Sequence, residues 1–406
     1  MNKKLDLITL QSAISSTAAA FRSRNTLQPA AGDGTKVFPP TYAGAVYATE
    51  DRRVKKPDGQ VETIPCVLLD SVQAQANRLE DALQAAIDAG RFDSSPIPLV
   101  QVDFSDEDLL NAVGKITSLQ APHRVADAIL RDSLLDGQPF RKSAIGAKLD
   151  HVSLQNATAL YEICPTALVF GIWDSTGPKG GLGAKFQRAF VSEVIGINAL
   201  IGKKTSSRID PLQIRAAAKV IKGSDSTYKL ADNDKQKGAV SPSEINHGNI
   251  PPDVSKSGGV TLDYAEQTSV LSLPALRRLH FPITDGDKIK RSPAIDAAGQ
   301  TVLAALALTS AALASETGFD LRSRCLLWPT GPLTWELLDK PGVVPAQLMI
   351  DSVSAIQILA EAVTAAEVLG LKWRKAPLIL TPSPQLVALL RRSQEISATE
   401  TSAVEE

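Results

Sequence analysis

The chain contains 406 residues, with 43 Lys or Arg, 44 Asp or Glu and a formal net charge of −1. This length allows a large core with insertions, or two domains, and the near-zero charge excludes a general polycation, so any nucleic-acid surface must be a local patch. Cys66, Cys164 and Cys325 are odd in number, far apart and set in apolar surroundings. They predict buried thiols of a cytoplasmic protein rather than a disulfide framework or a zinc site.

In the first half of the chain, hydrophobic patterns predict both strands and helices. Apolar residues between Val72 and Ile87 fit a 3.6-residue period, which predicts a helix over residues 71–89. Ser105 and the acidic residues 106–108 predict the start of another helix, and a further helix is expected around residues 124–135. Strands are predicted at residues 44–49, 61–69, 98–104 and 166–172, the last of which leads into a glycine-rich connection.

The second half of the chain continues this mixture. The uncharged run Ala297–Ser315 is rich in Ala, Ser and Thr, so it predicts a buried core helix rather than a membrane span. Because strands and helices do not alternate strictly, we expect an α+β fold with an antiparallel sheet. Strand-like or regular structure is predicted at residues 186–200, 259–264, 273–280, 322–328 and 377–381, and helices at residues 295–316 and 350–369.

The chain divides into four parts by composition. Between Lys203 and Gly238 there are nine Lys or Arg and four Asp or Glu, with frequent turn-forming residues. This predicts an inserted, solvent-reaching basic segment, for which a flexible surface loop is the alternative. The predicted parts are residues 1–202, the insertion at residues 203–259, residues 260–392, and an acidic, disordered tail at residues 393–406.

The most informative motif is WDSTGPKGGLGAKFQR, Trp173–Arg188. Its four glycines open the backbone to a ligand, and exposed N–H groups near cations suit a phosphate chain. GxxxxGK[ST] cannot be matched here, which excludes a nucleotide P-loop. The candidate phosphate contacts in this motif are Lys179, Gly180, Gly181, Lys185 and Arg188.

The helix predicted at residues 71–89 offers a second candidate surface. Ser71, Gln75 and Arg78 share one face at its N-terminal end, and Gln73 and Asn77 form a second polar stripe. These groups suit phosphates and sugars, although an ordinary solvated face is the alternative. Arg52, Arg53 and Arg208 are further basic candidates. Tyr42 and Trp173 can stack on a base or pack in the core.

Catalytic patterns are weak. The histidines, His123, His151, His247 and His280, show no paired metal-ligand spacing. Asp70 and Asp103 end predicted strands, where helix caps are more common than catalytic carboxylates. We therefore expect no catalytic residue, metal site or cofactor.

Several blocks of the sequence together resemble the RAMP-type backbone subunit of the type I-G (formerly I-U) CRISPR effector, the Cas-seven role also named in the Csb series. The similarity extends from about Val37 to Pro282, and the C-terminal third matches less distinctively. The blocks are VFPPTYAGAVYATEDRR, VLLDSVQAQANRLEDAL, ATALYEICPTALVFGIWDSTGPKGGLGAKFQRAFVSEVIGINAL, SRIDPLQI, PSEINHGNIPPD and GGVTLDYAEQTSVLSLPALRRLHFP.

This resemblance implies a modified RNA-recognition, ferredoxin-like core with large insertions, described as a palm with a thumb and a web. It implies a non-catalytic scaffold, copies of which polymerise along a CRISPR guide RNA that pairs with target DNA. The implied partners are further copies of the chain, the RNA-end-binding and large subunits of Cascade, and a recruited helicase-nuclease, with no membrane. The basic segment at residues 203–259 is the candidate thumb. A metal-dependent RAMP ribonuclease is the alternative function.

One departure from RNA-recognition modules matters. Such modules stack bases on sheet aromatics through a basic-glycine-aromatic motif, but only 5% of this chain is aromatic and the motif is absent. Recognition of the RNA backbone rather than its sequence is therefore expected.

Overall fold

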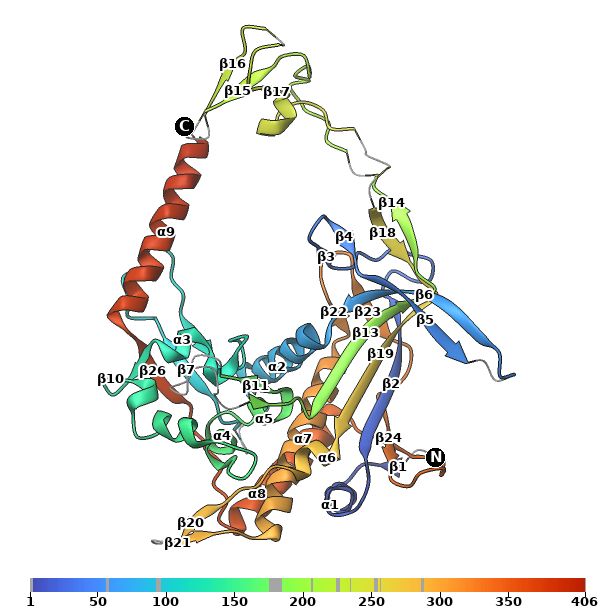
Figure 1. Cartoon of the computed structure of the whole chain (residues 1–406), viewed down its shortest axis with the longest axis vertical. Coiled ribbons are helices and arrows are strands. Elements are labelled where there is room, and N and C mark those ends of the chain that lie inside the picture. The colour runs from blue at the N-terminus through green and yellow to red at the C-terminus, as the bar shows by residue number, and fades with distance from the viewer. Residues whose placement is uncertain are drawn as a thin grey trace.

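A computed structural model describes residues 3–55, 58–92, 96–174, 185–205, 207–223, 227–233, 235–251, 255, 257–285 and 288–405. Helices and strands are intermixed along the chain, which confirms the predicted α+β class (Figure 1). The helices of the described residues are α1 (Leu7–Ser15), α2 (Val72–Asp88), α3 (Ala128–Arg131), α4 (Thr158–Ile163), α5 (Thr166–Phe170), α6 (Leu273–Arg277), α7 (Pro293–Glu316), α8 (Ser352–Val368) and α9 (Pro384–Glu405). Short 3-10 turns are η1 (Arg124–Ala126), η2 (Phe140–Lys142), η3 (Gly146–His151) and η4 (Pro242–Ile245).

A large mixed sheet organises one half of the molecule. Within the described residues its strand order is β1-β25-β24-β2-β19-β13-β6-β5, with β23 beside β2 and β22 beside β23. The pairs are antiparallel except for β1 with β25. The strands are β1 (Lys3–Lys4), β2 (Ala20–Pro29), β5 (Thr49–Lys55), β6 (Val61–Asp70), β13 (Phe190–Ile197), β19 (Tyr264–Ser272), β22 (Phe319–Asp320), β23 (Leu326–Pro329), β24 (Thr334–Leu338) and β25 (Ala346–Met349).

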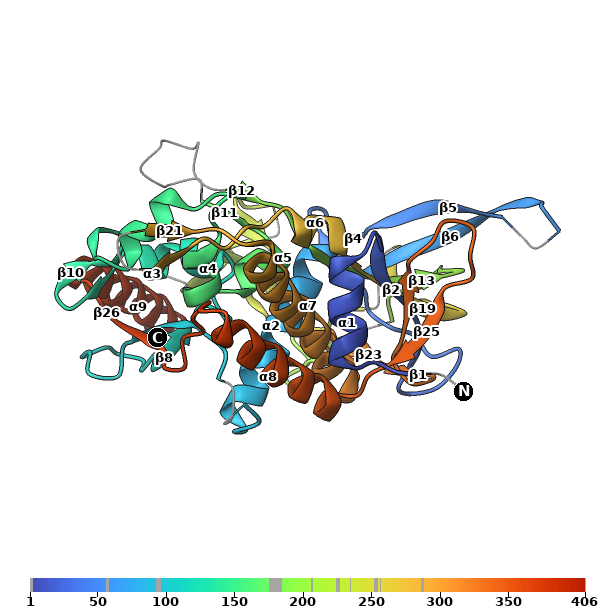
Figure 2. The same ribbon diagram turned by 90° about the horizontal axis from the view of Figure 1, so that it is seen from below.

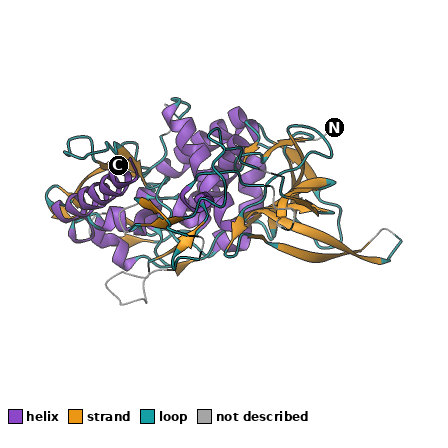
Figure 3. Cartoon of the chain, turned by 90° about the horizontal axis from the view of Figure 1, so that it is seen from above, coloured by secondary structure: helices purple, strands orange, loops and turns teal. Residues whose placement is uncertain are grey.

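Helices gather in the middle of the molecule, with the large sheet on one side (Figure 3). Helix α7 is their centre, because α1, α2, α6 and α8 all pack against it. It is long and apolar enough to cross a membrane, but 89% of its most apolar window is buried inside the protein. Gly299 lets α7 come close to its neighbour, since a Cβ there would lie 2.7 Å from Cδ2 of Phe281. The predicted core helix is therefore confirmed.

A second sheet lies on the other side of the helices (Figures 1 and 2). Its order is β10-β9-β26-β7-β8, and the β26–β7 pair is parallel. Its strands are β7 (Val100–Asp103), β8 (Lys115–Thr117), β9 (Ser133–Leu135), β10 (Gln138–Pro139) and β26 (Leu378–Pro382). Helix α9 leaves this sheet and rises at the left of Figure 1.

The chain between β13 and β19 forms an extension that we call the basic projection, comprising the described residues from Leu200 to Thr261. Strands β14 (Leu200–Lys203) and β18 (Ser257–Thr261) form the ribbon at its base. Beyond them lies a small sheet with the order β16-β15-β17, formed by β15 (Val220–Lys222), β16 (Tyr228–Leu230) and β17 (Ala239–Val240). The small sheet stands at the top of Figure 1, away from the large sheet and near the end of α9.

The segment Thr166–Phe170 is helix α5, so the predicted buried strand at residues 166–172 is wrong. All five residues are buried, and a short apolar run that is buried on every side has no periodicity to distinguish helix from strand. Pro165 occupies the N-cap position, and Gly171 ends the helix with a φ of +83°. Extended structure begins only after Gly171, with Ile172–Trp173.

Three other local predictions differ from the structure. No helix follows Ser105, because Asp103 accepts the Ser105 N–H at 3.0 Å and the chain turns back to β8. The helix expected at residues 124–135 is divided into η1, α3 and β9, since Arg124 adopts a φ of +53°. The tail predicted to be disordered continues α9 to Glu405.

Candidate nucleic-acid interface

The glycine-rich connection joins the two strands of a short hairpin. Strands β11 (Ile172–Trp173) and β12 (Lys185–Phe186) pair antiparallel, with Ile172 opposite Phe186 and Trp173 opposite Lys185. Lys179, Gly180 and Gly181 lie outside the described residues, as does all of 175–184. The described part of the motif therefore consists of the two strands that flank this connection.

The hairpin presents an aromatic ring and cations to solvent. Trp173 is 58% exposed, so its alternative as a core residue is wrong. The Lys185 ammonium lies 5.5 Å from the centroid of the Trp173 ring, a cation–π distance. An exposed ring beside a cation can stack on a nucleobase while the cation contacts the neighbouring phosphate.

Arg188 extends this cationic surface. It is exposed, and its Cγ lies against Gly171, where a Cβ would be 3.0 Å from Arg188 Cγ and 3.1 Å from Arg188 N. Partial burial and repulsion from Arg124 lower the pKa of the Arg188 guanidinium. In the part of the chain that the structure describes, no carboxylate forms an ion pair with Lys185 or Arg188. Their charge is therefore available to an external anion.

A cavity of about 250 Å³ opens beside Lys185. Its polar lining adds Gln187 and Arg278, neither of which the sequence singled out. The apolar lining comes from Leu154, Leu168, Phe186, Ala275 and Leu279. Arg278 is the C-cap of α6, 93 residues further along the chain than Lys185, so only the fold brings these two cations to one cavity.

A buried ion pair fixes the base of the hairpin. Arg124 Nε and Nη2 donate to the two oxygens of Glu80 at 2.7 and 2.6 Å, and both side chains are almost fully buried. Arg124 Nη1 also donates to the Gly171 carbonyl at 3.0 Å, and its guanidinium lies 5.7 Å from the Phe170 ring centroid. Burial raises the pKa of Glu80 to about 7, while Arg124 opposes the rise. The pair thus connects α2 to the residue that precedes β11.

A second ion pair holds the end of β11. Arg141 Nη1 contacts Asp174 at 2.8 Å, and Arg141 Nη2 contacts Asp150 at 2.5 Å. Asp174 directly follows Trp173 in the chain. The residues before and after the short strand are therefore both held by arginines, which fixes the backbone that carries the exposed Trp173 ring.

The predicted face of α2 has mostly internal partners. Ser71 is the N-cap and accepts the Ala74 N–H at 3.2 Å. Gln75 is 1% exposed, donates to Asp70 at 2.8 Å and accepts from Ser192 at 2.9 Å. Arg78 pairs with Asp70 at 3.0 Å and donates to the Leu321 carbonyl at 2.5 Å. These groups join the helix to the sheet and are not directed toward an external strand.

Only the second stripe of α2 remains open. Gln73 and Asn77 are exposed, so their amides are accessible to a ligand. They lie on the opposite side of the helix from the buried Gln75 and Leu79, as their spacing predicts.

The remaining basic candidates lie on other elements. Arg52 on β5 is paired with Glu50 and, at 3.0 Å, with Glu193, whereas Arg53 on the same strand is exposed. Arg208 forms an isolated bridge with Ile250 inside the basic projection. The structure therefore does not bring these three arginines into one site with Lys185 and Arg188.

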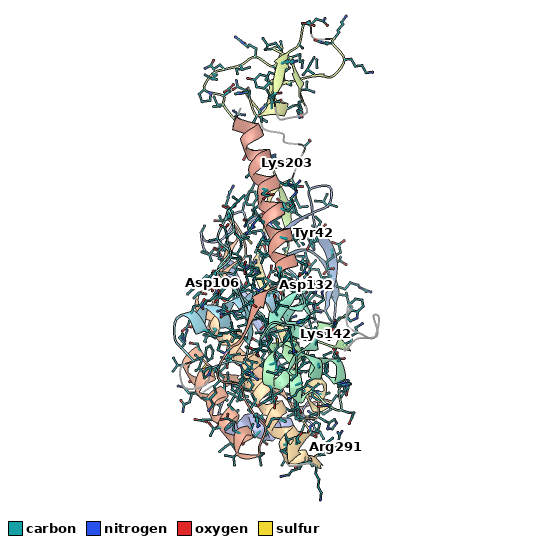
Figure 4. The ribbon with its side chains drawn as sticks, turned by 90° about the vertical axis from the view of Figure 1, so that its left-hand side faces the viewer. Tyr42, Asp106, Asp132, Lys142, Lys203 and Arg291 are labelled. Atoms are coloured by element: carbon teal, nitrogen blue, oxygen red, sulfur yellow. The ribbon has the colours of Figure 1, made fainter. Side chains whose placement is uncertain are left out.

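Tyr42 lies on a small hairpin of β3 (Thr41–Tyr42) and β4 (Val46–Tyr47) and is 46% exposed. The hairpin stands near the base of the basic projection, where Figure 4 labels Lys203 above Tyr42. Within the described residues from 203 to 251, the projection carries nine Lys or Arg and three Asp or Glu. Asp210 organises its turn by accepting the Gly248 N–H at 2.8 Å and the Ile214 N–H at 3.2 Å.

The outer face of the large sheet differs from the hairpin because its charges are paired. Arg22 contacts Glu336 at 2.5 Å, and Arg24 contacts Glu266 at 2.6 Å. Arg52 and Glu193 continue the same pattern. The sheet face therefore offers phosphates little uncompensated positive charge.

The described residues contain no group of three His, Cys, Asp or Glu that could hold a metal ion. Asp70 is buried among Gln75, Arg78 and Arg322, and His280 contacts Asp296 at 2.6 Å. Cys66, Cys164 and Cys325 are free and buried, as predicted. Burial raises the pKa of each of these thiols.

Residues 21–200 match the model of a family described as CRISPR-associated protein GSU0053 (Cas_GSU0053). The match includes β2, α2, the β11–β12 hairpin and β13, and ends as the basic projection begins. It relates this part of the chain to a CRISPR-associated family and indicates a CRISPR-related function. No curated protein matches the chain.

Proposed function

We propose that the chain is the guide-RNA-binding backbone subunit of a type I-G CRISPR effector, a scaffold with no cleavage activity of its own. The observation that carries the proposal is the β11–β12 hairpin, which presents Trp173, Lys185 and Arg188 to solvent without an acidic partner among the described residues. The relation to a CRISPR-associated family covers this hairpin.

The strand order supports a RAMP-type core. In the series β24-β2-β19-β13, α2 lies in the chain between β2 and β13, and α7 lies between β19 and β24. This is the order of a ferredoxin-like βαββαβ unit, in which the first strand lies between the third and the fourth. Strands β5 and β6, inserted before α2, extend it at the β13 edge. The basic projection between the second and third strands of this unit is the candidate thumb.

The chemistry of the site suits a guide RNA whose bases must stay free to pair. Cations and backbone N–H groups grip phosphate and sugar and leave base edges free to pair with target DNA. A few contacts in each copy become a strong, salt-dependent interaction when many copies line one RNA. A head-to-tail contact between copies that does not close into a ring propagates as a helical filament. The end-binding subunit, the large subunit and the helicase-nuclease would bind to this filament.

The test is the affinity of the purified full-length protein for several unrelated single-stranded RNAs, measured by fluorescence anisotropy over a range of salt concentrations. The variant is Lys185→Glu with Arg188→Glu, and the matched control is Lys55→Glu with Lys340→Glu, two exposed lysines elsewhere. We expect the variant to lose at least about tenfold in affinity for every RNA, because each contact to a charged group contributes about 1.5–3 kcal/mol. The slope of log K against log salt should fall by about 1.4. Unchanged affinity would show that the hairpin is not the RNA site.

A further inference from the structure

Two adjoining cavities form a groove beside α4, at the opposite end of the molecule from the basic projection. One, of about 360 Å³, lies between η3, α4 and the hairpin of β20 (Ile283–Asp285) and β21 (Lys288–Lys290). The other, of about 570 Å³, is lined by the segment Gly370–Ala376 that precedes β26. They share Glu162, Gly370 and Lys372, so they are continuous. We call them the α4 groove.

The α4 groove carries excess positive charge. Its lining contains four Lys or Arg, two Glu and His151. Lys375 pairs with Glu367 at 3.4 Å, which leaves Lys148, Lys372 and Arg374 against Glu162. Burial raises the pKa of the Glu162 carboxyl, and the same three cations oppose the rise, so all three act on the space around it.

The groove also offers further hydrogen-bonding groups. Nε of Arg374 is buried and has no acceptor among the described residues, an arrangement that an incoming oxygen atom would relieve. The side chains of Asn156, Thr158 and Thr284 line the same space. Cations, a free N–H and small polar groups are the set of side chains that contacts sugar and phosphate.

One turn connects this groove to the β11–β12 hairpin. Leu154 lines the cavity beside Lys185 and Arg278, while Asn156, two residues later, lines the α4 groove. Between them, the Gln155 carbonyl accepts a hydrogen bond from Arg291 at 3.0 Å. Because this acceptor is neutral, it does not compensate the charge of Arg291. In Figure 4 Arg291 lies near the lower end of the molecule, far from Lys203 of the basic projection.

We infer that the α4 groove is a second phosphate site on the path of the same single-stranded RNA. The strand passes from Trp173 and Lys185, over the turn at residues 153–156, to Lys148 and Lys372. Two sites separated by this turn predict that affinity rises in two stages as the RNA lengthens. This inference rests on the proposed function, because the hairpin is taken as the first site.

The experiment measures binding of uridine oligonucleotides from about 4 to about 16 nucleotides, the range of site sizes known for single-strand binding folds. The full-length protein is compared with Lys148→Glu/Lys372→Glu and with the hairpin variant Lys185→Glu/Arg188→Glu. Lys55→Glu/Lys340→Glu is the control for net charge, since all these lysines are exposed. If the glutamate variant of the groove does not fold, Lys148→Gln/Lys372→Gln replaces it.

The groove variant should bind the shortest oligonucleotides that the wild type binds with unchanged affinity and lose at least about tenfold for the longest. The hairpin variant should lose affinity at every length. Equal binding of long RNA by the groove variant and the wild type overturns the inference and leaves the proposed function intact. Equal loss at all lengths also overturns it, because the groove would then not be a separate, later contact. If only the groove variant loses affinity, the hairpin is not the first site and the inferred path is wrong.

Discussion

The Glu80–Arg124 pair makes a sharp prediction because its charges are buried and its contacts are specific. In Arg124→Met, Glu80 would lose both hydrogen bonds and its cation while remaining in a site that is 0% exposed. Removing one partner of such a pair costs about 3–5 kcal/mol, whereas replacing both with apolar side chains is often close to neutral. We expect the single variant to lose about this much unfolding free energy at pH 8, and Glu80→Leu/Arg124→Met to lose clearly less.

The cost should also depend on pH. Burial raises the pKa of Glu80 to about 7 in the folded protein, so the folded state binds this proton more tightly than the unfolded state. Stability from this group is therefore present below the unfolded pKa and is lost as the pH rises through the folded pKa. In the wild type the loss amounts to about 3 kcal/mol between pH 4.5 and 7.

Without the guanidinium the pKa of Glu80 rises further, so the variant keeps losing stability above pH 7, where the wild type has levelled. Between pH 6 and pH 8 we therefore expect the gap between Arg124→Met and the wild type to grow by about 1 kcal/mol. Urea unfolding at both pH values measures this gap, and the double variant, which has no carboxyl at position 80, should show no such growth. A gap that stays constant, or a double variant as unstable as the single one, would contradict the account.

Two further predictions concern the hairpin and the chemistry. Gly171→Ala places a Cβ at a φ of +83° and about 3 Å from Arg188, so it should destabilise the hairpin by about 1–3 kcal/mol and weaken RNA binding. Hydrogen exchange of the Trp173 and Phe186 amides measures the destabilisation directly, and unchanged exchange would contradict the prediction. Incubation of the purified protein with Mg²⁺ and end-labelled RNA should leave the strands intact on a denaturing gel, and site-dependent fragments that vanish with EDTA would favour the alternative ribonuclease.

Long helices could be predicted well from the sequence. Helices α2, α7 and α8 each span at least 17 residues and fall within a few residues of the predicted ranges. In α2 the apolar residues repeat with the helical period, whereas α7 is buried on nearly every side and was predicted from its uncharged run. Helix α5 could not be predicted, because five buried residues contain little more than one turn. The break at Arg124 depends on a left-handed φ that its partners, Glu80 and Gly171, stabilise from far along the chain.

The candidate site was only partly accessible to sequence reasoning. The spacing of Ser71, Gln75 and Arg78 predicted a shared face but not what that face would contact. Both Gln75 and Arg78 donate hydrogen bonds to Asp70 at the end of the preceding strand, so their side chains have partners inside the protein. Arg278 was missed because nothing in its local sequence indicates that α6 lies beside β12.

The distribution of ion pairs, rather than the number of cations, therefore decides where a polyanion can bind this nearly neutral chain. On the outer sheet face, a phosphate near Arg24 or Arg52 would have to displace Glu266 or Glu193, and the exchange of one anion for another gains little. At the hairpin, Lys185 has no carboxylate partner among the described residues and lies beside the Trp173 ring, so a phosphate there adds an attraction without breaking an ion pair. The acidic residues that balance the total charge also neutralise the sheet arginines, and this favours the hairpin as the entry point of the RNA in the proposed function.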